Sequence, residues 1–238
     1  MSSYVKGSTL EKQIQKQLKV WDAAKKVADK AEVPRPFITI SREYGCDAGS
    51  FAAAIAEELN RQEKTDVWQS YERELVDKIV EDHDISEKLI ETIDTKKREE
   101  INEFWRTVLT DYPPQVSVYQ KLVRTVRGLA IHGQAIFVGR AAVMITRDLK
   151  YGVHLRFVAP ASYRIHKIME KAGIRDRLEA EKLVVSKDKE RHEFLTQYLK
   201  FEAFNPASYD LTINVSKTTK EEVAQIVLAL LKSKGLIK

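Results

Sequence analysis

The sequence predicts an α/β fold in which helices cover a parallel sheet. Short runs of β-branched, aromatic and other apolar residues, roughly five residues each, alternate with longer segments of helical periodicity. This alternation is typical of βαβ units, whose strands lie parallel. With 238 residues, 43% of them hydrophobic, the chain can bury a large core. The expected strands are Phe37–Ser41, Asp66–Gln69, Ala135–Val138, Val153–Val158 and Leu211–Val215.

The helices are expected between and around these strands. An amphipathic helix over residues 9–31 ends before Val33–Pro36, because proline disfavours helical geometry in the residue that precedes it. We therefore divide the chain into a helical extension, residues 1–35, and a domain, residues 36–238. The extension is suited either to packing on the domain or to contacting a partner or a second copy of the chain. The other expected helices are Phe51–Leu59, a long helix from an N-cap at Ser86 to Thr110 that stops before Pro113-Pro114, Val116–His132, Ala161–Lys171, Glu179–Phe201, and a C-terminal helix begun by a capping box at Thr219 and Glu222.

Composition argues against several classes of function. Of the net charge of +5, +4 comes from residues 1–30, so the predicted domain is nearly neutral and nucleic acid is a disfavoured partner. The longest apolar runs have six residues, too few to span a membrane. The single cysteine forms no disulfide framework, and the five histidines include no H-x-x-x-H pair that would bind a metal. A cytoplasmic protein is the expectation.

The loop after the first strand is the most informative segment. It reads Ser41-Arg42-Glu43-Tyr44-Gly45-Cys46-Asp47-Ala48-Gly49-Ser50 and leads into a helix. A strand–glycine loop–helix unit presents backbone N–H groups and a helix N-terminus to an anion. A Walker A motif would also need a lysine where this loop has Ser50. On spacing alone, a phosphate loop and an ordinary βα turn both remain open.

Further motifs follow this loop in a specific order. They are Tyr71-Glu72-Arg73-Glu74-Leu75, Val138-Gly139-Arg140-Ala141-Ala142, Val158-Ala159-Pro160 with Arg164, Asp188-x-x-Arg191, and Asn205-Pro206-x-x-Tyr209-Asp210-Leu211-x-Ile213-Asn214. Together with the loop, they resemble the cytidylate kinase-like family, a divergent branch of the P-loop nucleoside monophosphate kinases. The resemblance covers about Pro36–Leu231.

The resemblance implies a three-layer P-loop fold with strand order 2-3-1-4-5. It also implies transfer of the ATP γ-phosphoryl group, with Mg²⁺, to a nucleoside monophosphate such as CMP or dCMP. The implied nucleotide-binding residues are Tyr44, Gly45, Cys46, Asp47, Ala48, Gly49 and Ser50, with the Ser50 hydroxyl on Mg²⁺. The implied acceptor-site residues are Glu72, Arg73 and Arg140, and the implied catalytic residues are Arg42, Arg164, Asp188 and Arg191.

Physical chemistry assigns these side chains roles that can be tested. Arg42 would supply the charge of the missing lysine, and Arg140 could grip the acceptor phosphate through its planar fork. Arg164 and Arg191 would close over the transferring phosphate, with Asp188 orienting Arg191. The alternatives are a structural salt bridge for Arg140 and ion pairs on a helix surface for the other three. For Ser50 the alternative is a plain helix N-cap.

Two substitutions weaken the resemblance at the loop, where Asp47 and Ala48 replace glycines of the family pattern. A carboxylate about 5 Å from a phosphate oxygen costs on the order of 3 kcal/mol at an effective dielectric constant near 20. Asp47 would avoid this cost by capping the helix or by pairing with Arg42. Alanine does not adopt a positive φ cheaply. The alternative function is therefore a catalytically weak or inactive nucleotide-binding, regulatory module with the same fold.

Overall fold

The computed structural model describes residues 35–81, 87, 89–91, 93, 95–108, 117–198 and 201–238, together with Lys19. The helix expected over residues 9–31 lies outside the described residues, Lys19 apart, and so do Ser86 and Pro113-Pro114. None of the helices within the described ranges has both the length and the apolar character needed to cross a membrane.

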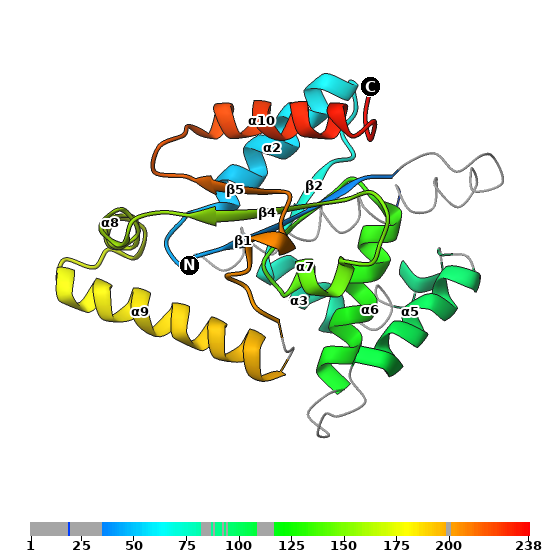
Figure 1. Cartoon of the computed structure of the whole chain (residues 1–238), viewed down its shortest axis with the longest axis horizontal. Coiled ribbons are helices and arrows are strands. Elements are labelled where there is room, and N and C mark those ends of the chain that lie inside the picture. The colour runs from blue at the N-terminus through cyan, green and yellow to red at the C-terminus, as the bar shows by residue number, and fades with distance from the viewer. Residues whose placement is uncertain are drawn as a thin grey trace, which may run out of the picture.

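A five-stranded parallel sheet forms the centre of the described structure (Figure 1). Its strand order is β2-β3-β1-β4-β5, as the resemblance implied, and the α/β fold class is confirmed. In the central strand, Ile38 is opposite Ile136 of β3 on one side and Val153 of β4 on the other. The strands are β1 (Phe37–Arg42), β2 (Gln69–Tyr71), β3 (Ala135–Val138), β4 (Gly152–Val158) and β5 (Leu211–Asn214).

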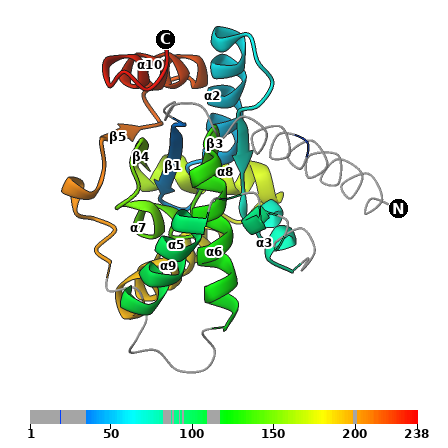
Figure 2. The same cartoon turned by 90° about the vertical axis from the view of Figure 1, so that its right-hand side faces the viewer.

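Helices cover both faces of this sheet, which makes three layers (Figure 2). On one face, α2 (Ala48–Glu63) and α10 (Lys220–Ser233) pack over side chains such as Ile38 and Ile40 of β1. On the other face, Phe37 and Phe137 join a second cluster with helices that follow β2 and β3. These helices are α3 (Arg73–Glu81), α5 (Thr95–Val108), α6 (Ser117–His132) and α7 (Ala142–Thr146).

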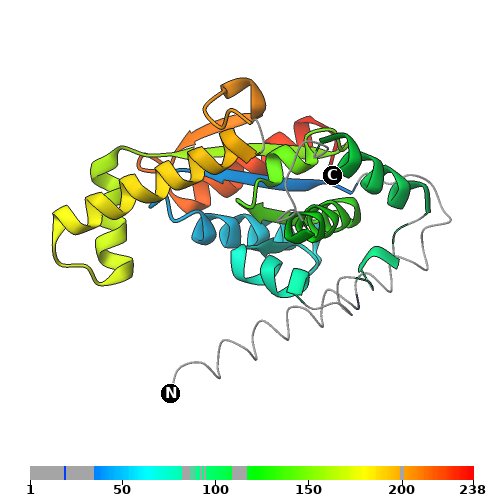
Figure 3. The same ribbon diagram turned by 90° about the horizontal axis from the view of Figure 1, so that it is seen from below.

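Two further helices form a hairpin that projects beyond the sheet (Figure 3). They are α8 (Ala161–Ala172), which follows β4, and α9 (Arg177–Glu193). A small apolar cluster that includes Ile165 and Val184 joins them. This hairpin brings polar side chains from the C-terminal half of the chain over the loop that follows β1.

Several helix predictions need correction. The single helix expected over residues 86–110 is wrong, because Ile93 lies in a bend and α5 begins only at Thr95. The sequence analysis missed α3 and α7. The helix expected to reach Phe201 ends as a π-helical turn over Phe194–Tyr198. The capping box is confirmed, because the Thr219 hydroxyl accepts from the Glu222 N–H at 3.1 Å and the Glu222 carboxylate accepts from the Thr219 N–H at 2.8 Å.

Candidate active site at the carboxyl ends of β1 and β3

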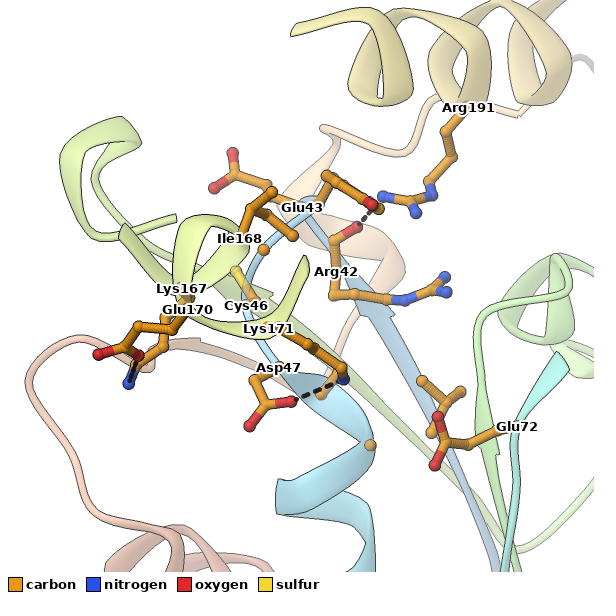
Figure 4. Close-up of a pocket in the computed structure, with 15 residues that line it drawn as sticks. Arg42, Glu43, Cys46, Asp47, Glu72, Lys167, Ile168, Glu170, Lys171 and Arg191 are labelled. Carbon is orange, nitrogen blue, oxygen red and sulfur yellow. Dashed lines mark hydrogen bonds and ion pairs between the residues drawn. The ribbon is translucent and has the colours of Figure 1, made fainter. Parts of the chain in front are cut away.

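A pocket of about 420 Å³ lies where β1 ends, between the loop, α8 and α9 (Figure 4). Parallel α/β sheets bind ligands at this edge. Its lining combines four basic and four acidic side chains with the backbone of the loop. The lining residues are Arg42, Glu43, Tyr44, Gly45, Cys46, Asp47, Ala48, Gly49, Glu72, Val138, Lys167, Ile168, Glu170, Lys171 and Arg191.

Two loop residues carry the backbone through the turn into α2. Gly45 has φ +92°, and a Cβ there would lie 2.7 Å from the Arg164 carbonyl oxygen, so only glycine fits. Asp47, the N-cap of α2, has φ +50°. Ala48 is the first helical residue, so the expectation of backbone strain at Ala48 was wrong and the left-handed conformation falls on Asp47.

The loop amides divide into two groups. The N–H groups of Tyr44, Cys46 and Ser50 donate to protein oxygens, at 2.7 Å to Asp188 Oδ1, 3.4 Å to the Glu43 carbonyl and 3.0 Å to the Asp47 carbonyl. Those of Asp47, Ala48 and Gly49 donate to no described residue. Free amides at a helix N-terminus suit an anion such as phosphate. Ser50 lies within the first turn of α2, so it is not the N-cap.

Cys46 does not expose its thiol at this surface. The side chain is fully buried, and its Sγ lies 3.7 Å from the Phe157 carbonyl oxygen. Burial, followed by the negative charge of Glu43, raises the pKa of the thiol to about 12. A thiol that stays neutral near pH 7 is a poor nucleophile, so cysteine chemistry is disfavoured.

Arg164 of α8 connects the loop to α9 through hydrogen bonds of its guanidinium. Its Nε donates to the Ala159 carbonyl at 3.0 Å, and its Nη1 donates to the Tyr44 carbonyl at 3.1 Å and to Asp188 Oδ2 at 2.5 Å. Glu43 lies 3.4 Å from the same guanidinium. Only 12% of the side chain is exposed and its partners lie on other elements, so this is not a helix-surface ion pair. In this arrangement Arg164 faces the loop backbone and does not line the pocket.

Arg191 and Asp188 approach the loop from α9. Arg191 Nη1 donates to the Arg42 carbonyl at 3.0 Å and lies 3.6 Å from Asp188 Oδ1, as an orienting carboxylate would require. Burial is the main cause that lowers the pKa of Arg191. Unlike Arg164, Arg191 lines the pocket.

The guanidinium of Arg42 has an unusual environment. Burial, followed by the charges of Arg191 and Arg140 and opposed by Glu72, lowers its pKa to about 10. No side-chain hydrogen bond or ion pair joins this guanidinium to a residue that the structure describes, and Glu72 acts on it through its charge alone. It lies against Gly139, where a Cβ would collide with Nη1. Figure 4 shows the side chain extending from the end of β1 across from Glu72.

Asp47 takes neither of the two orientations expected from the sequence. It makes no side-chain cap hydrogen bond, and its Oδ1 pairs with Lys171 Nζ of α8 at 3.2 Å and not with Arg42 (Figure 4). Both expected orientations are therefore wrong, although the carboxylate does gain a cationic partner.

A second loop leaves β3 beside the first. Gly139, Arg140 and Ala141 have φ of +79°, +55° and +54°, a run of three left-handed residues before α7. The Arg140 guanidinium is hydrogen-bonded to the Asp77 carboxylate of α3, and Arg73 lies 3.5 Å from that carboxylate. The structure thus contains the carboxylate pairing that the alternative for Arg140 described.

Of the other two expected acceptor-site residues, Glu72 lines the pocket and Arg73 does not. The Glu72 carboxylate faces the pocket close to Gly49, where a Cβ would lie 2.6 Å from Oε2. The Arg73 side chain is 77% exposed and does not line the pocket.

The sequence analysis missed the contribution of α8 to the pocket. Arg164, Lys167 and Lys171 are spaced three and four residues apart, which places them on one face of a helix. This spacing was the available signal, because that helix had been predicted. Lys167 pairs with Glu170 at 2.9 Å on its own helix, whereas Lys171 reaches the loop.

The strand order, the loop at the end of β1 and the arginines around it define a nucleotide kinase-like protein of the P-loop class. A model of the cytidylate kinase-like family matches residues 37–217, and the chain belongs to that family. The resemblance stated from the motifs is confirmed.

Solved structures with a similar fold include an uncharacterized protein from Eubacterium ventriosum, with a TM-score of 0.63 and 18% identity over 84% of this chain and 99% of that one. A shikimate kinase from Bacteroides thetaiotaomicron gives a TM-score of 0.46 and 9% identity over 83% of this chain and 98% of that one. Among curated proteins, a uronate isomerase from Corynebacterium glutamicum is 24% identical over 99 residues. That match covers 42% of this chain and spans about a fifth (19%) of the isomerase.

Proposed function

We propose that this protein transfers the γ-phosphoryl group of ATP to a nucleoside monophosphate, with CMP or dCMP as the first acceptors to test. The observation that carries the proposal is the Arg42 guanidinium, which is partly buried, makes no hydrogen bond or ion pair to a described residue and lies in a pocket beside loop amides that donate to no described residue. A cation that is withdrawn from water is costly unless it is paired. A nucleotide phosphate supplies that pairing.

The remaining residues take roles that fit phosphoryl transfer, which needs positioning and charge neutralisation more than covalent chemistry. The amides of Asp47, Ala48 and Gly49 would bind phosphate oxygens at the N-terminus of α2. Arg191 would neutralise charge from the α9 side, held by Asp188, while Arg164 keeps the loop in place. Arg140 would bind the acceptor phosphate once it exchanges Asp77 for that ligand.

The residues present also fit a magnesium ion. Mg²⁺ in phosphoryl-transfer sites binds one or two protein oxygens and takes its other ligands from phosphates and water. Ser50, in the first turn of α2, and Glu72, in the pocket, would provide the protein oxygens. The ion would supply neutralisation of the phosphate charge.

The second candidate is a nucleotide-binding regulatory module with little or no turnover. The observation that favours it is the Asp47 carboxylate at the N-terminus of α2, where its negative charge opposes a phosphate and its Oδ1 pairs with Lys171. This candidate predicts nucleotide binding without phosphoryl transfer.

One set of measurements separates the two candidates. The full chain is tested for thermal stabilisation by ATP with Mg²⁺, and for phosphoryl transfer to a panel of nucleoside monophosphates and other small acceptors. A ligand at 100 times its dissociation constant adds about 2.7 kcal/mol to the free energy of unfolding. Adenosine, which lacks phosphate, is the control and should give no comparable stabilisation.

The outcomes are distinct. Stabilisation with transfer supports the kinase, and stabilisation without transfer to any acceptor supports the regulatory module. No stabilisation by any nucleotide at millimolar concentration overturns both candidates.

A further inference from the structure

The loop after β1 contains no lysine, yet the pocket contains a lysine that reaches it from another helix. Lys171 lies near the end of α8, and its Nζ is 3.2 Å from Asp47 Oδ1, a residue 124 positions earlier in the chain. Because Asp47 is the N-cap of α2, this ammonium lies beside the N-terminus of that helix (Figure 4). The amides of Asp47, Ala48 and Gly49 there donate to no described residue.

We propose that Lys171 is the phosphate-binding lysine of this site, and that Asp47 is an internal counter-ion which the nucleotide phosphate displaces. The inference rests on the proposed function and deepens it. In place of a lysine within the loop, α8 supplies the positive charge, and the loop supplies a carboxylate that holds it near the phosphate position.

The properties of the pair suit such an exchange. The Lys171 side chain is 71% exposed and that of Asp47 is 25% exposed, so the pair is screened by water and readily broken. An ammonium on a four-carbon stem has three donors and can turn from a carboxylate to a phosphate oxygen with little rearrangement. A polyphosphate carries more negative charge than the single carboxylate that it would replace.

The second lysine in the pocket shows why Lys171 is the residue to test. Lys167 forms its ion pair with Glu170 of its own helix, at 2.9 Å, and Asp47 of the loop acts on it only through its charge. Lys171 is the pocket lysine whose ion pair, among the described residues, joins α8 to the loop.

A simpler role must be separated from this one, because Lys171 could act only by neutralising Asp47. The two roles differ in a double-mutant cycle. If Lys171 binds phosphate directly, removing it weakens binding even when Asp47 carries no charge. If it only neutralises Asp47, its removal has no effect once Asp47 is replaced by asparagine, which also tolerates the left-handed backbone of this position.

The experiment measures dissociation constants of ATP with Mg²⁺ and of inorganic tripolyphosphate by titration calorimetry. The proteins are the full chain and its Lys171→Met, Asp47→Asn and double variants. Lys189→Met is the matched control, because Lys189 is 73% exposed and pairs with Glu193 on α9, away from the pocket lining. Unchanged melting temperatures would show that the exposed substitutions leave the fold intact.

We expect Lys171→Met to weaken ATP binding at least tenfold and Asp47→Asn to strengthen it severalfold. In the Asp47→Asn variant, Lys171→Met should still weaken binding at least fivefold, while Lys189→Met changes it less than twofold. An effect below twofold when Lys171→Met is added to Asp47→Asn overturns the inference and leaves the proposed function standing. Binding of tripolyphosphate that depends on Lys171, without binding of ATP, supports the inference and overturns the proposed function. Binding of neither ligand overturns both.

Discussion

Two arginines leave neighbouring strands at the same edge of the sheet, in different electrostatic environments. Arg42 ends β1 and Arg140 follows β3, and residues Ile40 and Val138 of these strands are opposite each other in the sheet. Arg140 is hydrogen-bonded to the Asp77 carboxylate. Arg42 makes no such bond to a described residue and lies close to two other arginines, with Glu72 as a partial compensation.

The difference between the two arginines indicates where binding of an anion would be most favourable. The lowered pKa of Arg42 corresponds to at most about 3 kcal/mol of destabilisation in the free protein, which a phosphate could recover. At Arg140 the fold already provides a negative charge, and a phosphate must replace Asp77. We therefore expect Arg42, at the end of β1, to bind the ATP phosphates strongly. We expect Arg140, after β3, to bind the acceptor phosphate more weakly.

The largest expected effect is that of Arg42→Met. Losing charge-assisted hydrogen bonds to phosphate should weaken ATP binding at least about a hundredfold, since such bonds contribute about 1.5–3 kcal/mol each. The melting temperature should stay the same or rise, because the variant removes a partly buried cation that makes no hydrogen bond or ion pair to a described residue. Titration calorimetry and thermal unfolding measure both quantities.

Arg61→Met is the control for Arg42→Met. Arg61 is 68% exposed and pairs with Glu58 on the surface of α2, so its loss removes the same charge away from the pocket. A lower melting temperature for Arg42→Met, with ATP binding unchanged, would mean that Arg42 stabilises the fold and does not bind the nucleotide phosphate.

The next effect concerns the β3 side. Arg140→Lys keeps the charge but loses the planar fork, and should weaken acceptor binding by about 1.5–3 kcal/mol while ATP affinity stays nearly constant. Arg140→Ala should affect the acceptor more and lower the free energy of unfolding by about 1 kcal/mol or less, because Asp77 is 36% exposed. Destabilisation by about 3 kcal/mol or more would identify a structural ion pair and refute the acceptor role.

Local patterns explain how much of this fold could be predicted from sequence. The strand cores, the capping box at Thr219 and the helix over Ser117–His132 depend on neighbouring residues, and they were predicted within a few positions. The helix α7 has five residues and follows Arg140 and Ala141 in left-handed conformations. Those two residues give no sequence signal for such a turn, so α7 was missed.

In the candidate site too, features set by neighbouring residues could be predicted, and contacts between distant residues could not. The motifs locate the loop, because the positive φ of Gly45 is a requirement of the local backbone that a glycine in the sequence reveals. The pairings are different, since they join residues 63 positions apart for Arg140 and Asp77 and 124 apart for Asp47 and Lys171. Which charges meet at such separations depends on how helices pack, and no local pattern encodes it.

A smaller effect on ATP binding is expected from Gly139→Ala, which changes the position of the Arg42 guanidinium. The position has φ +79°, and the added Cβ would collide with Arg42 Nη1, so the guanidinium must move away from its present place. We expect ATP affinity to fall about tenfold, together with about 1–3 kcal/mol of lost stability.

Gly173→Ala is the matched control for Gly139→Ala. Gly173 has φ +67° and no atom within 4 Å of the added Cβ, so this variant isolates the backbone cost of alanine at positive φ. It should lose about 1 kcal/mol of stability and no ATP affinity. Equal effects of the two variants on ATP affinity would refute the contact-based explanation.

The smallest effect is expected from Asp77→Asn, which makes Arg140 more like Arg42. Asparagine keeps the shape of the side chain but removes the negative charge, so an acceptor phosphate no longer competes with a carboxylate. Calorimetric titration with CMP should show about a threefold gain in affinity, with less than about 1 kcal/mol of lost stability because the pair is partly exposed. Asp148→Asn is the control, because it removes the carboxylate that Arg127 binds at 2.8 Å outside the pocket lining, and should leave CMP affinity unchanged. Unchanged or weaker CMP binding by Asp77→Asn would show that Asp77 holds Arg140 in its binding position and does not compete with the ligand.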